Sequence, residues 1–287
     1  MKQHEQQIGR PGKMLIFFGD NNFSKLNSYK RYIWGLIAMI FASAGMAAPA
    51  DELKIGSPDL SQAEQVSSLK NFQPNPNEFR IYFIGDSITR HGFNKTIIEQ
   101  LKWDHVAGMA ASSESKDFSH LVANRIQQLL PDKKVKLFFG KGGDSLHALT
   151  GIPDACEYRP ALVIVQLGEH VNADEKTSKT AADYAALLDA LKALPEMPVI
   201  ICTGVWSPAL TSGKYLGHTA EVEKIQRETS ARKGAAFVSV EKYAVNPACS
   251  GTGGSFGVKW HPNDAGHAGY AEAIIAAFTR IYFQNHK

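Results

Sequence analysis

Five short apolar runs, each bounded by turn residues, recur along the chain between residues 80 and 240. They cover residues 80–84, 135–139, 161–167, 198–202 and 236–240. Each run is short and apolar rather than alternating, which is typical of a strand buried on both faces of a parallel sheet. Parallel neighbours need a crossover connection, usually a helix, so the segments between the runs are expected to be helical.

Three segments between or after the runs carry apolar residues at the i, i+3, i+4 spacing of a helix with one buried face. The stripes are Phe118, Leu121, Val122, Ile126 and Leu129; Tyr184, Leu187, Leu188, Leu191 and Leu194; and Ala271, Ile274, Ile275, Phe278, Ile281 and Tyr282. The alternation of strands and helices predicts right-handed crossovers and a doubly wound α/β sheet. Because no internal repeat or second boundary interrupts it, we expect one domain over residues 79–287.

Net charge separates the first 50 residues from the rest. Residues 1–50 hold six Lys and Arg against two Asp and Glu, whereas residues 51–287 hold 25 and 26, so the formal charge of +3 belongs to the leading segment. A nearly neutral body offers no chain-wide attraction to nucleic acid or to an anionic membrane. Apolar content of 44% and charged content of 21% exclude a disordered or collagen-like chain.

The leading segment has the parts of a secretory signal. A basic pair, Lys30-Arg31, precedes an apolar stretch, and small residues with an A-x-A-like end follow it. We therefore expect residues 1–50 to be an N-terminal extension with a signal peptide at about 30–50, and the protein to be periplasmic or secreted. The alternative is an uncleaved membrane anchor, because residues 32–50 are nearly long enough to span a bilayer.

Two smaller expectations concern the next segment and the cysteines. Residues 51–78 are polar, with prolines near their end, and are interpreted as a linker or an edge decoration. Export permits disulfides, and Cys156 with Cys249 is a candidate pair because both fall in expected loops. Cys202 lies within an apolar run and is expected to be a small buried side chain.

Four segments follow the expected strands or precede the last helix, and reactive groups collect at the carboxyl ends of strands in doubly wound sheets. They are Gly85-Asp86-Ser87-Ile88, Gly140-Lys141-Gly142-Gly143-Asp144-Ser145, Gly168-Glu169-His170-Val171-Asn172 and His261-Pro262-Asn263-Asp264. Ser87 is expected near the start of a helix, where backbone N–H groups favour developing negative charge. Pro262 prevents the last helix from extending back through His261. Asn263 or Asp264 can cap that helix.

These four segments, in this order, resemble the sequence blocks of the SGNH (GDSL-type) hydrolase superfamily over nearly the whole of residues 79–287. The resemblance implies a three-layer α/β/α flavodoxin-like sandwich with a mostly parallel sheet of about five strands, and hydrolysis of small acyl esters. It also implies that Ser87 is the nucleophile and His261 the general base. Gly143 matches the glycine whose N–H joins the Ser87 N–H in the oxyanion hole. The chemistry agrees, because a serine hydroxyl is a weak nucleophile until an imidazole takes its proton.

The third segment departs from the family pattern. The family has Gly-x-Asn there, whose side-chain amide donates to the oxyanion, and this chain has His170 at that position. His170 can donate a ring N–H instead, Asn172 can swing in, or His170 lies outside the oxyanion hole. Losing one oxyanion donor lowers the rate by about a hundred- to a thousandfold, so the replacement matters for activity.

A second departure concerns the acid of the triad. The family pattern is Asp-x-x-His, but Val258 stands three residues before His261. A backbone carbonyl near Val258 can accept the imidazole N–H and give a Ser-His dyad, as in some carbohydrate-esterase branches of the superfamily. Alternatively, Glu169 or Asp264 supplies the acid, or the site is weakened. We favour the carbonyl, because it requires no new side chain.

Several further residues are candidates for a role at the site. Gly143-Asp144-Ser145-Leu146 also spells the family motif, but Ser145 as nucleophile leaves no strand to supply an oxyanion glycine before the third segment. Arg90, His91 and Trp206 are candidate substrate-binding residues, with core packing as the alternative for the tryptophan. No zinc-binding spacing and no G-x-G-x-x-G after the first strand occur, so neither a metal nor a cofactor is expected.

The sequence therefore predicts an exported serine esterase that removes short acyl groups, such as acetyl, from a carbohydrate or another small alcohol through an acyl-Ser87 intermediate. Its expected partner is that small-molecule or carbohydrate ester. No nucleic-acid partner is expected, and a membrane only if the N-terminal segment stays uncleaved. The alternative is a carbohydrate- or ester-binding protein on the same fold, with catalysis weakened at Val258 and His170.

Overall fold

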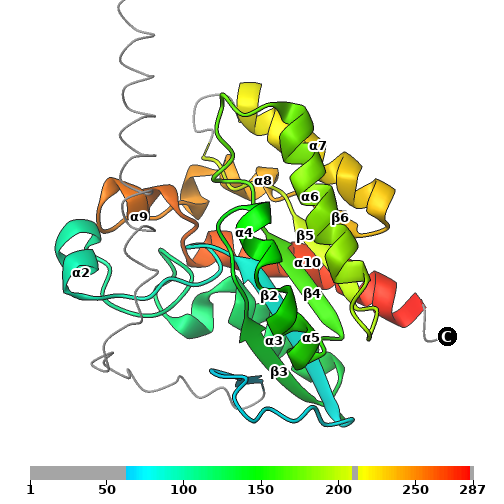
Figure 1. The fold of residues 1–287 in the computed structure, drawn as a ribbon. Coiled ribbons are helices and arrows are strands. Elements are labelled where there is room, and N and C mark those ends of the chain that lie inside the picture. The colour runs from blue at the N-terminus through cyan, green and yellow to red at the C-terminus, as the bar shows by residue number, and fades with distance from the viewer. Residues whose placement is uncertain (1–62, 209–212, 285–287) are drawn as a thin grey trace, which may run out of the picture. The chain divides into compact units, whose positions relative to one another are not determined.

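Within residues 63–208 and 213–284, which the computed structural model describes, six parallel strands form one sheet (Figure 1). The strands are β1 (Glu64–Gln65), β2 (Glu78–Gly85), β3 (Lys134–Phe139), β4 (Leu162–Gln166), β5 (Val199–Thr203) and β6 (Ala236–Val238). Their order in the sheet is β1-β3-β2-β4-β5-β6. The predicted runs correspond to β2 through β6, and β1 is an addition at the edge.

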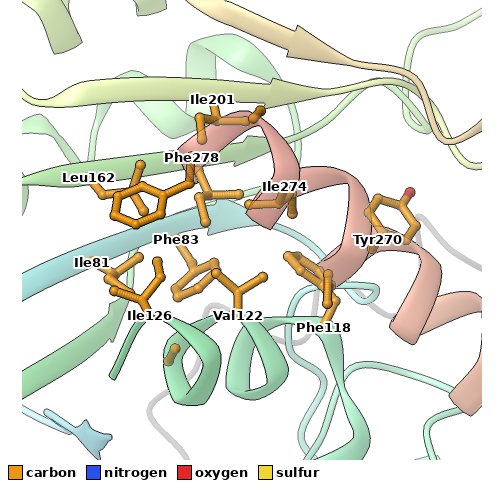
Figure 2. Close-up of a cluster of buried hydrophobic side chains, with 14 of the residues drawn as sticks. Ile81, Phe83, Phe118, Val122, Ile126, Leu162, Ile201, Tyr270, Ile274 and Phe278 are labelled. Atoms are coloured by element: carbon orange, nitrogen blue, oxygen red, sulfur yellow. The ribbon is translucent and has the colours of Figure 1, made fainter. Parts of the chain in front are cut away.

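The central strands are buried on both faces, which explains their unbroken apolar sequences. In β2, Ile81 and Phe83 face one hydrophobic cluster, while Tyr82 and Ile84 face the other. The strands β4 and β5 divide their side chains between the same two clusters. Figure 2 shows the first cluster, in which sheet residues such as Phe83 pack against helices α3 (Phe118–Leu129) and α10 (Asp264–Gln284). Period-2 burial on both sides is the expected outcome of a covered parallel sheet.

Helices cover both faces of the sheet, so the predicted three-layer α/β fold is confirmed. Helices α3 and α10 lie on the face of the first cluster, and α4 (Ser145–Leu149), α5 (Ile152–Tyr158) and α6 (Thr177–Lys192) lie on the other. Helix α7 (Gly217–Lys233) packs beside α6 and β6. The remaining elements are α2 (Lys95–Leu101), α8 (Glu241–Ala244), α9 (Phe256–Trp260) and the 3₁₀ turns η1 (Glu114–Lys116) and η2 (Pro247–Cys249).

Helix α7 carries no apolar stripe that the sequence analysis could single out. Its buried residues include Val222 and Ile225, but also polar side chains. These polar members are Glu223, Gln226, Thr229 and Ser230. Periodicity in hydrophobicity is therefore weak in a helix that is nevertheless well packed, because its buried face is held partly by polar contacts.

The segment before β2 decorates the edge of the sheet in its described part. Strand β1 pairs with the outer side of β3, and Leu69 is buried in the cluster that contains Tyr82. Residues 1–62, with the predicted signal peptide or anchor, lie outside the described residues. Among the helices of the described part, none combines the length and the apolar character that crossing a bilayer requires.

The predicted Cys156–Cys249 disulfide is wrong, since both thiols are free in the structure. Cys156 is exposed on α5, which packs on one face of the sheet, whereas Cys249 is buried in the cluster on the opposite face. The sheet therefore separates the two side chains. The expectation failed because it placed both residues in loops. Cys202 is buried on β5, as predicted.

Candidate active site

The parallel register brings the ends of three neighbouring strands to one edge of the sheet. Strand β2 lies between β3 and β4, with Phe83 opposite Phe139 and Gly85 opposite Gln166. The loops that follow these strands therefore begin side by side. This is the edge where doubly wound folds collect their reactive groups.

Ser87 lies in a single hydrogen-bonded turn directly after β2. The N–H groups of Thr89 and Arg90 both donate to the carbonyl of Asp86, each at 2.9 Å. The predicted helix start at Ser87 is therefore wrong, since the next helix, α2, begins only at Lys95. The backbone therefore forms one hydrogen-bonded turn after Asp86 and does not continue into a helix. This turn still leaves the Ser87 side chain partly exposed at the edge of the sheet.

Two further contacts hold the Ser87 turn in place. The Ser87 carbonyl accepts the N–H of Met109 at 2.7 Å. The hydroxyl of Thr89 donates to the side chain of Gln166 on β4 at 2.9 Å, and both of these side chains are buried. The nucleophile candidate is thus tied to the neighbouring strand and to a distant loop. Such support from buried hydrogen bonds restricts the position of a side chain within a site.

The loop after β3 passes directly over the end of β2. A Cβ at Gly142 would lie 1.6 Å from the carbonyl oxygen of Gly85, so only glycine permits this approach. The next residue, Gly143, has φ +97°, a backbone conformation that residues with a side chain rarely adopt. The predicted oxyanion glycine is therefore held in the loop that packs on the nucleophile turn.

His261 follows the short helix α9, and that helix supplies its hydrogen-bond partner. The N–H of His261 donates to Val258, in a 3₁₀ pattern, at 3.0 Å. This leaves the Gly257 carbonyl, which a full α-helical turn would pair with that N–H, open at the helix end. The Nδ1 of His261 donates to the Gly257 carbonyl at 2.6 Å. A backbone carbonyl beside Val258 therefore occupies the place of the missing aspartate.

Ser87 and His261 meet across the site. The Ser87 Oγ lies 2.7 Å from Nε2 of His261. A carbonyl can only accept, so the bond to Gly257 requires the proton on Nδ1 and leaves Nε2 as an acceptor for the serine hydroxyl. Burial lowers the pKa of His261 to about 4, although the Gly257 carbonyl and the nearby Asp86 oppose this shift. At neutral pH the imidazole is neutral and able to take a proton.

Neither carboxyl group considered in place of the missing acid reaches His261, because each is engaged elsewhere. Asp264 accepts from both the N–H and the hydroxyl of Ser112, each at 2.7 Å. Glu169 accepts the backbone N–H of Trp206 at 2.7 Å. The cap of α10 comes from Asn263, whose side chain accepts from the N–H groups of Ala265 and Gly266.

Trp206 is fully buried, so its predicted role in substrate binding is wrong. Its indole N–H donates to the carbonyl of Trp260 at 2.7 Å, and its ring belongs to the core. The backbone of His261 itself is held as well, because its carbonyl accepts the N–H of Gly251 at 2.8 Å. The loop after β5 turns its aromatic side chain inward, where it holds the backbone beside His261.

His170 pairs with a carboxylate to which the sequence analysis gave no role. Its Nε2 lies 2.8 Å from Oδ2 of Asp86, the residue before Ser87. Burial alone would lower the pKa of His170, but the nearby carboxyl groups, Asp86 foremost, together outweigh it and the pKa is raised. Burial raises the pKa of the neighbouring Glu169 to about 8, and Asp86 adds to that rise. The sequence signal available for this pair was the carboxylate of Asp86, which directly precedes Ser87 in the Gly-Asp-Ser block.

The remaining candidates lie around the nucleophile turn. The Arg90 guanidinium stacks over the Phe139 ring, 4.8 Å from its centroid, and pairs with Glu114 at 3.4 Å. His91 is partly buried and contacts the Gly92 carbonyl through Nδ1, and burial lowers its pKa. Ser145 begins α4, which Asp144 caps. Substrate binding by Arg90 and His91 stays a prediction.

The GDSL-like Lipase/Acylhydrolase family matches residues 83–268, a span that includes Ser87, Gly143, His170 and His261. The chain therefore belongs to this family of ester hydrolases. No curated protein sequence matches the chain.

Solved structures share the fold at low sequence identity. A two-domain esterase active on acetylated mannans, crystallised with mannopentaose, is 16% identical with a TM-score of 0.50, and the match covers 71% of this chain and 50% of that one. A Parabacteroides merdae protein assigned to the GDSL-like lipases is 16% identical with a TM-score of 0.52, covering 70% of this chain and 95% of that one. The chain spans half the length of the mannan-active esterase.

The depressed pKa of His261 can be measured directly. We expect the Cε1 proton of His261, followed by NMR, to titrate near pH 4 in the folded protein and near about 6.5 in denaturant. Because the folded value is the lower one, stability that depends on a neutral His261 is lost as pH falls from about 6.5 towards the folded value. A folded pKa at or above that of the denatured chain would contradict the buried, carbonyl-bound imidazole.

Proposed function

We propose that the protein is a serine esterase that acts through a Ser87–His261 dyad and an acyl-Ser87 intermediate. The observation that carries this proposal is the 2.7 Å contact between Ser87 Oγ and a His261 ring whose tautomer is set by the Gly257 carbonyl. A nucleophile in reach of a base, with the base oriented by a third group, is the arrangement that activates serine. Here the third group is a backbone carbonyl rather than a carboxylate.

The proposed reaction has two halves. In the first, Ser87 Oγ attacks the ester carbonyl carbon while its proton moves to Nε2 of His261, and the resulting imidazolium protonates the departing alcohol. In the second, His261 takes a proton from water, which attacks the acyl-serine, and then returns that proton to Ser87 Oγ as the acid leaves. The Gly257 carbonyl keeps Nδ1 protonated throughout, and so keeps the ring in the useful orientation.

The negative charge of the tetrahedral intermediate needs donors in the same region. The proposed donors are the N–H groups of Ser87 and Gly143 together with His170 in the place of the family asparagine. Gly143 and His170 border one cavity of about 20 Å³, with apolar Leu167 and Val171 on its wall. The short acyl group, such as acetyl, is proposed from the shared fold with an esterase active on acetylated mannans.

Ser87 and Ser145 give a matched test of the nucleophile. We expect Ser87→Ala to lower kcat/KM for p-nitrophenyl acetate by at least about a thousandfold, because the acyl-enzyme can no longer form. Ser145→Ala, in the second Gly-Asp-Ser sequence, should retain most of the activity. The assay uses purified residues 51–287. The assignment of Ser87 fails if the Ser87→Ala variant keeps its activity, or if activity is lost in Ser145→Ala but not in Ser87→Ala.

For the alcohol part, the proposal is a carbohydrate. It is supported by the shared fold with an esterase active on acetylated mannans. We expect acetate release from acetylated mannan or xylan, and a fall in kcat/KM along p-nitrophenyl acetate, butyrate and octanoate, the order expected if the natural acyl group is acetyl. Wild-type protein that hydrolyses none of these esters, and that binds the polysaccharide without deacetylating it, would favour the alternative of a binding protein.

We further propose that the protein is exported, on the strength of the basic pair and apolar stretch in residues 30–50. N-terminal sequencing of the mature protein from the periplasm or medium is expected to begin close to residue 51. A chain recovered intact in the membrane fraction would favour the anchor.

A further inference from the structure

The Asp86–His170 pair joins two of the three loops at the site. Asp86 begins the nucleophile turn after β2, and its side chain is 1% exposed. His170 comes from the loop after β4, the neighbouring strand, and is 19% exposed. Their 2.8 Å contact therefore lies immediately beside Ser87, whose own hydroxyl bonds to His261. A buried carboxylate beside an imidazole favours the protonated ring.

Asp86 is the carboxyl group that acts most strongly on the pKa of His170. The carboxyl groups that act on it come from three elements: Asp86 after β2, Glu169 after β4 and Asp144 before α4. Glu169 holds its own proton up to about pH 8, so at neutral pH it adds little negative charge. Asp86 is also within electrostatic reach of His261 and His91. Of these imidazoles, only His170 has a carboxylate in direct contact and a raised pKa.

The two imidazoles of the site are thus driven in opposite directions. His261 is buried and bound to a neutral carbonyl, which favours its uncharged form, whereas His170 contacts a carboxylate, which favours its protonated form. When neighbouring titratable groups are separated in this way, their environments indicate different chemical roles. A neutral ring suits a base, and a charged ring suits stabilisation of a developing anion.

His170 also lies where such a charge is useful. It borders the same small cavity as Gly143, the glycine proposed to donate to the oxyanion, and Asp86 lies next to Ser87 in the chain. A positive charge in a partly buried site stabilises a nearby oxyanion more strongly than the same charge in water, although the Asp86 carboxylate in contact with it offsets part of this effect. This effect acts through space and does not depend on which ring nitrogen faces the cavity.

We propose that Asp86 is a positioning residue that keeps His170 protonated, and that ester hydrolysis draws on the His170 charge to stabilise the oxyanion. This rests on the proposed esterase function. When Ser87 Oγ forms its bond to the carbonyl carbon, the carbonyl π pair moves to oxygen and the serine proton goes to His261. His170 keeps its proton throughout the step. The asparagine of the family pattern is thereby replaced by a charged group whose effect depends on pH.

The sign of that dependence follows from the raised pKa of His170. The imidazolium is present below its folded pKa and is lost as pH rises through it, so kcat/KM is expected to fall on the alkaline side. The acid side is governed by His261, which becomes protonated only near pH 4. A purely structural role for the pair, in which it anchors the loop after β4, predicts no such alkaline limb from His170.

The test is the pH profile of kcat/KM for phenyl acetate, corrected for spontaneous hydrolysis, in wild type, His170→Asn and Asp86→Asn. Wild type should lose about a hundredfold across the alkaline limb, the effect of one oxyanion donor. In His170→Asn the limb should disappear, because an amide does not titrate. In Asp86→Asn it should move to lower pH. Asp132→Asn, an equivalent change at an exposed position, should leave the profile unchanged.

An alkaline limb that is the same in wild type and His170→Asn would overturn the proposal, as would an unchanged limb in a folded Asp86→Asn. If Asp86→Asn does not fold, an NMR titration of His170 in the wild-type protein tests instead whether this ring is protonated. A pKa above about 6.5 supports the charge, and a lower value refutes it. Wild type that hydrolyses no ester at any pH would instead reject the esterase function, while the same NMR titration would still report on the pair.

Discussion

The position of β2 between β3 and β4 is the constraint on which the site depends. Because all three strands run parallel, their following loops start at one edge, and the middle strand delivers both Asp86 and Ser87 to the centre of it. The loop after β3 then crosses the end of β2 so closely that Gly142 tolerates no side chain. Without this register, Ser87, Gly143 and His170 would belong to unrelated parts of the surface.

Within that frame, two histidines acquire different properties from different partners. A carbonyl at the end of α9 orients His261 without adding charge, so a buried ring stays neutral and accepts the serine proton. A carboxylate beside His170 compensates the cost of burying a charged ring. The chain thus departs from the family pattern at Val258 and at His170, and each departure is accompanied by a local partner. Burial of Trp206 supports the first of these arrangements, since its indole holds the backbone next to His261.

Much of the architecture could be predicted from the sequence because the strands are buried on both faces. Their unbroken apolar runs located β2 to β6, and the stripes located α3, α6 and α10. The strand and helix signals are local, and each depends on a few neighbouring residues. The pairing of Ser87 with His261 came instead from the resemblance of the four blocks to those of the family.

The rest required contacts between segments far apart in the chain. The carbonyl of Gly257 is left open because α9 ends in a 3₁₀ turn, and no residue in the sequence predicts that ending. Asp86 faces His170 only because β2 and β4 are neighbours, and the interior position of Trp206 follows from how its loop turns. Helix α7 escaped notice because polar side chains share its buried face.

The most direct measurement of the central claim is to locate the adduct of a serine-directed phosphonate by peptide mass spectrometry. If the carbonyl-oriented His261 activates Ser87, one adduct should form per chain, on Ser87, and its formation should slow strongly in His261→Ala. An adduct on Ser145, or equal labelling rates with and without the His261 imidazole, would contradict the account.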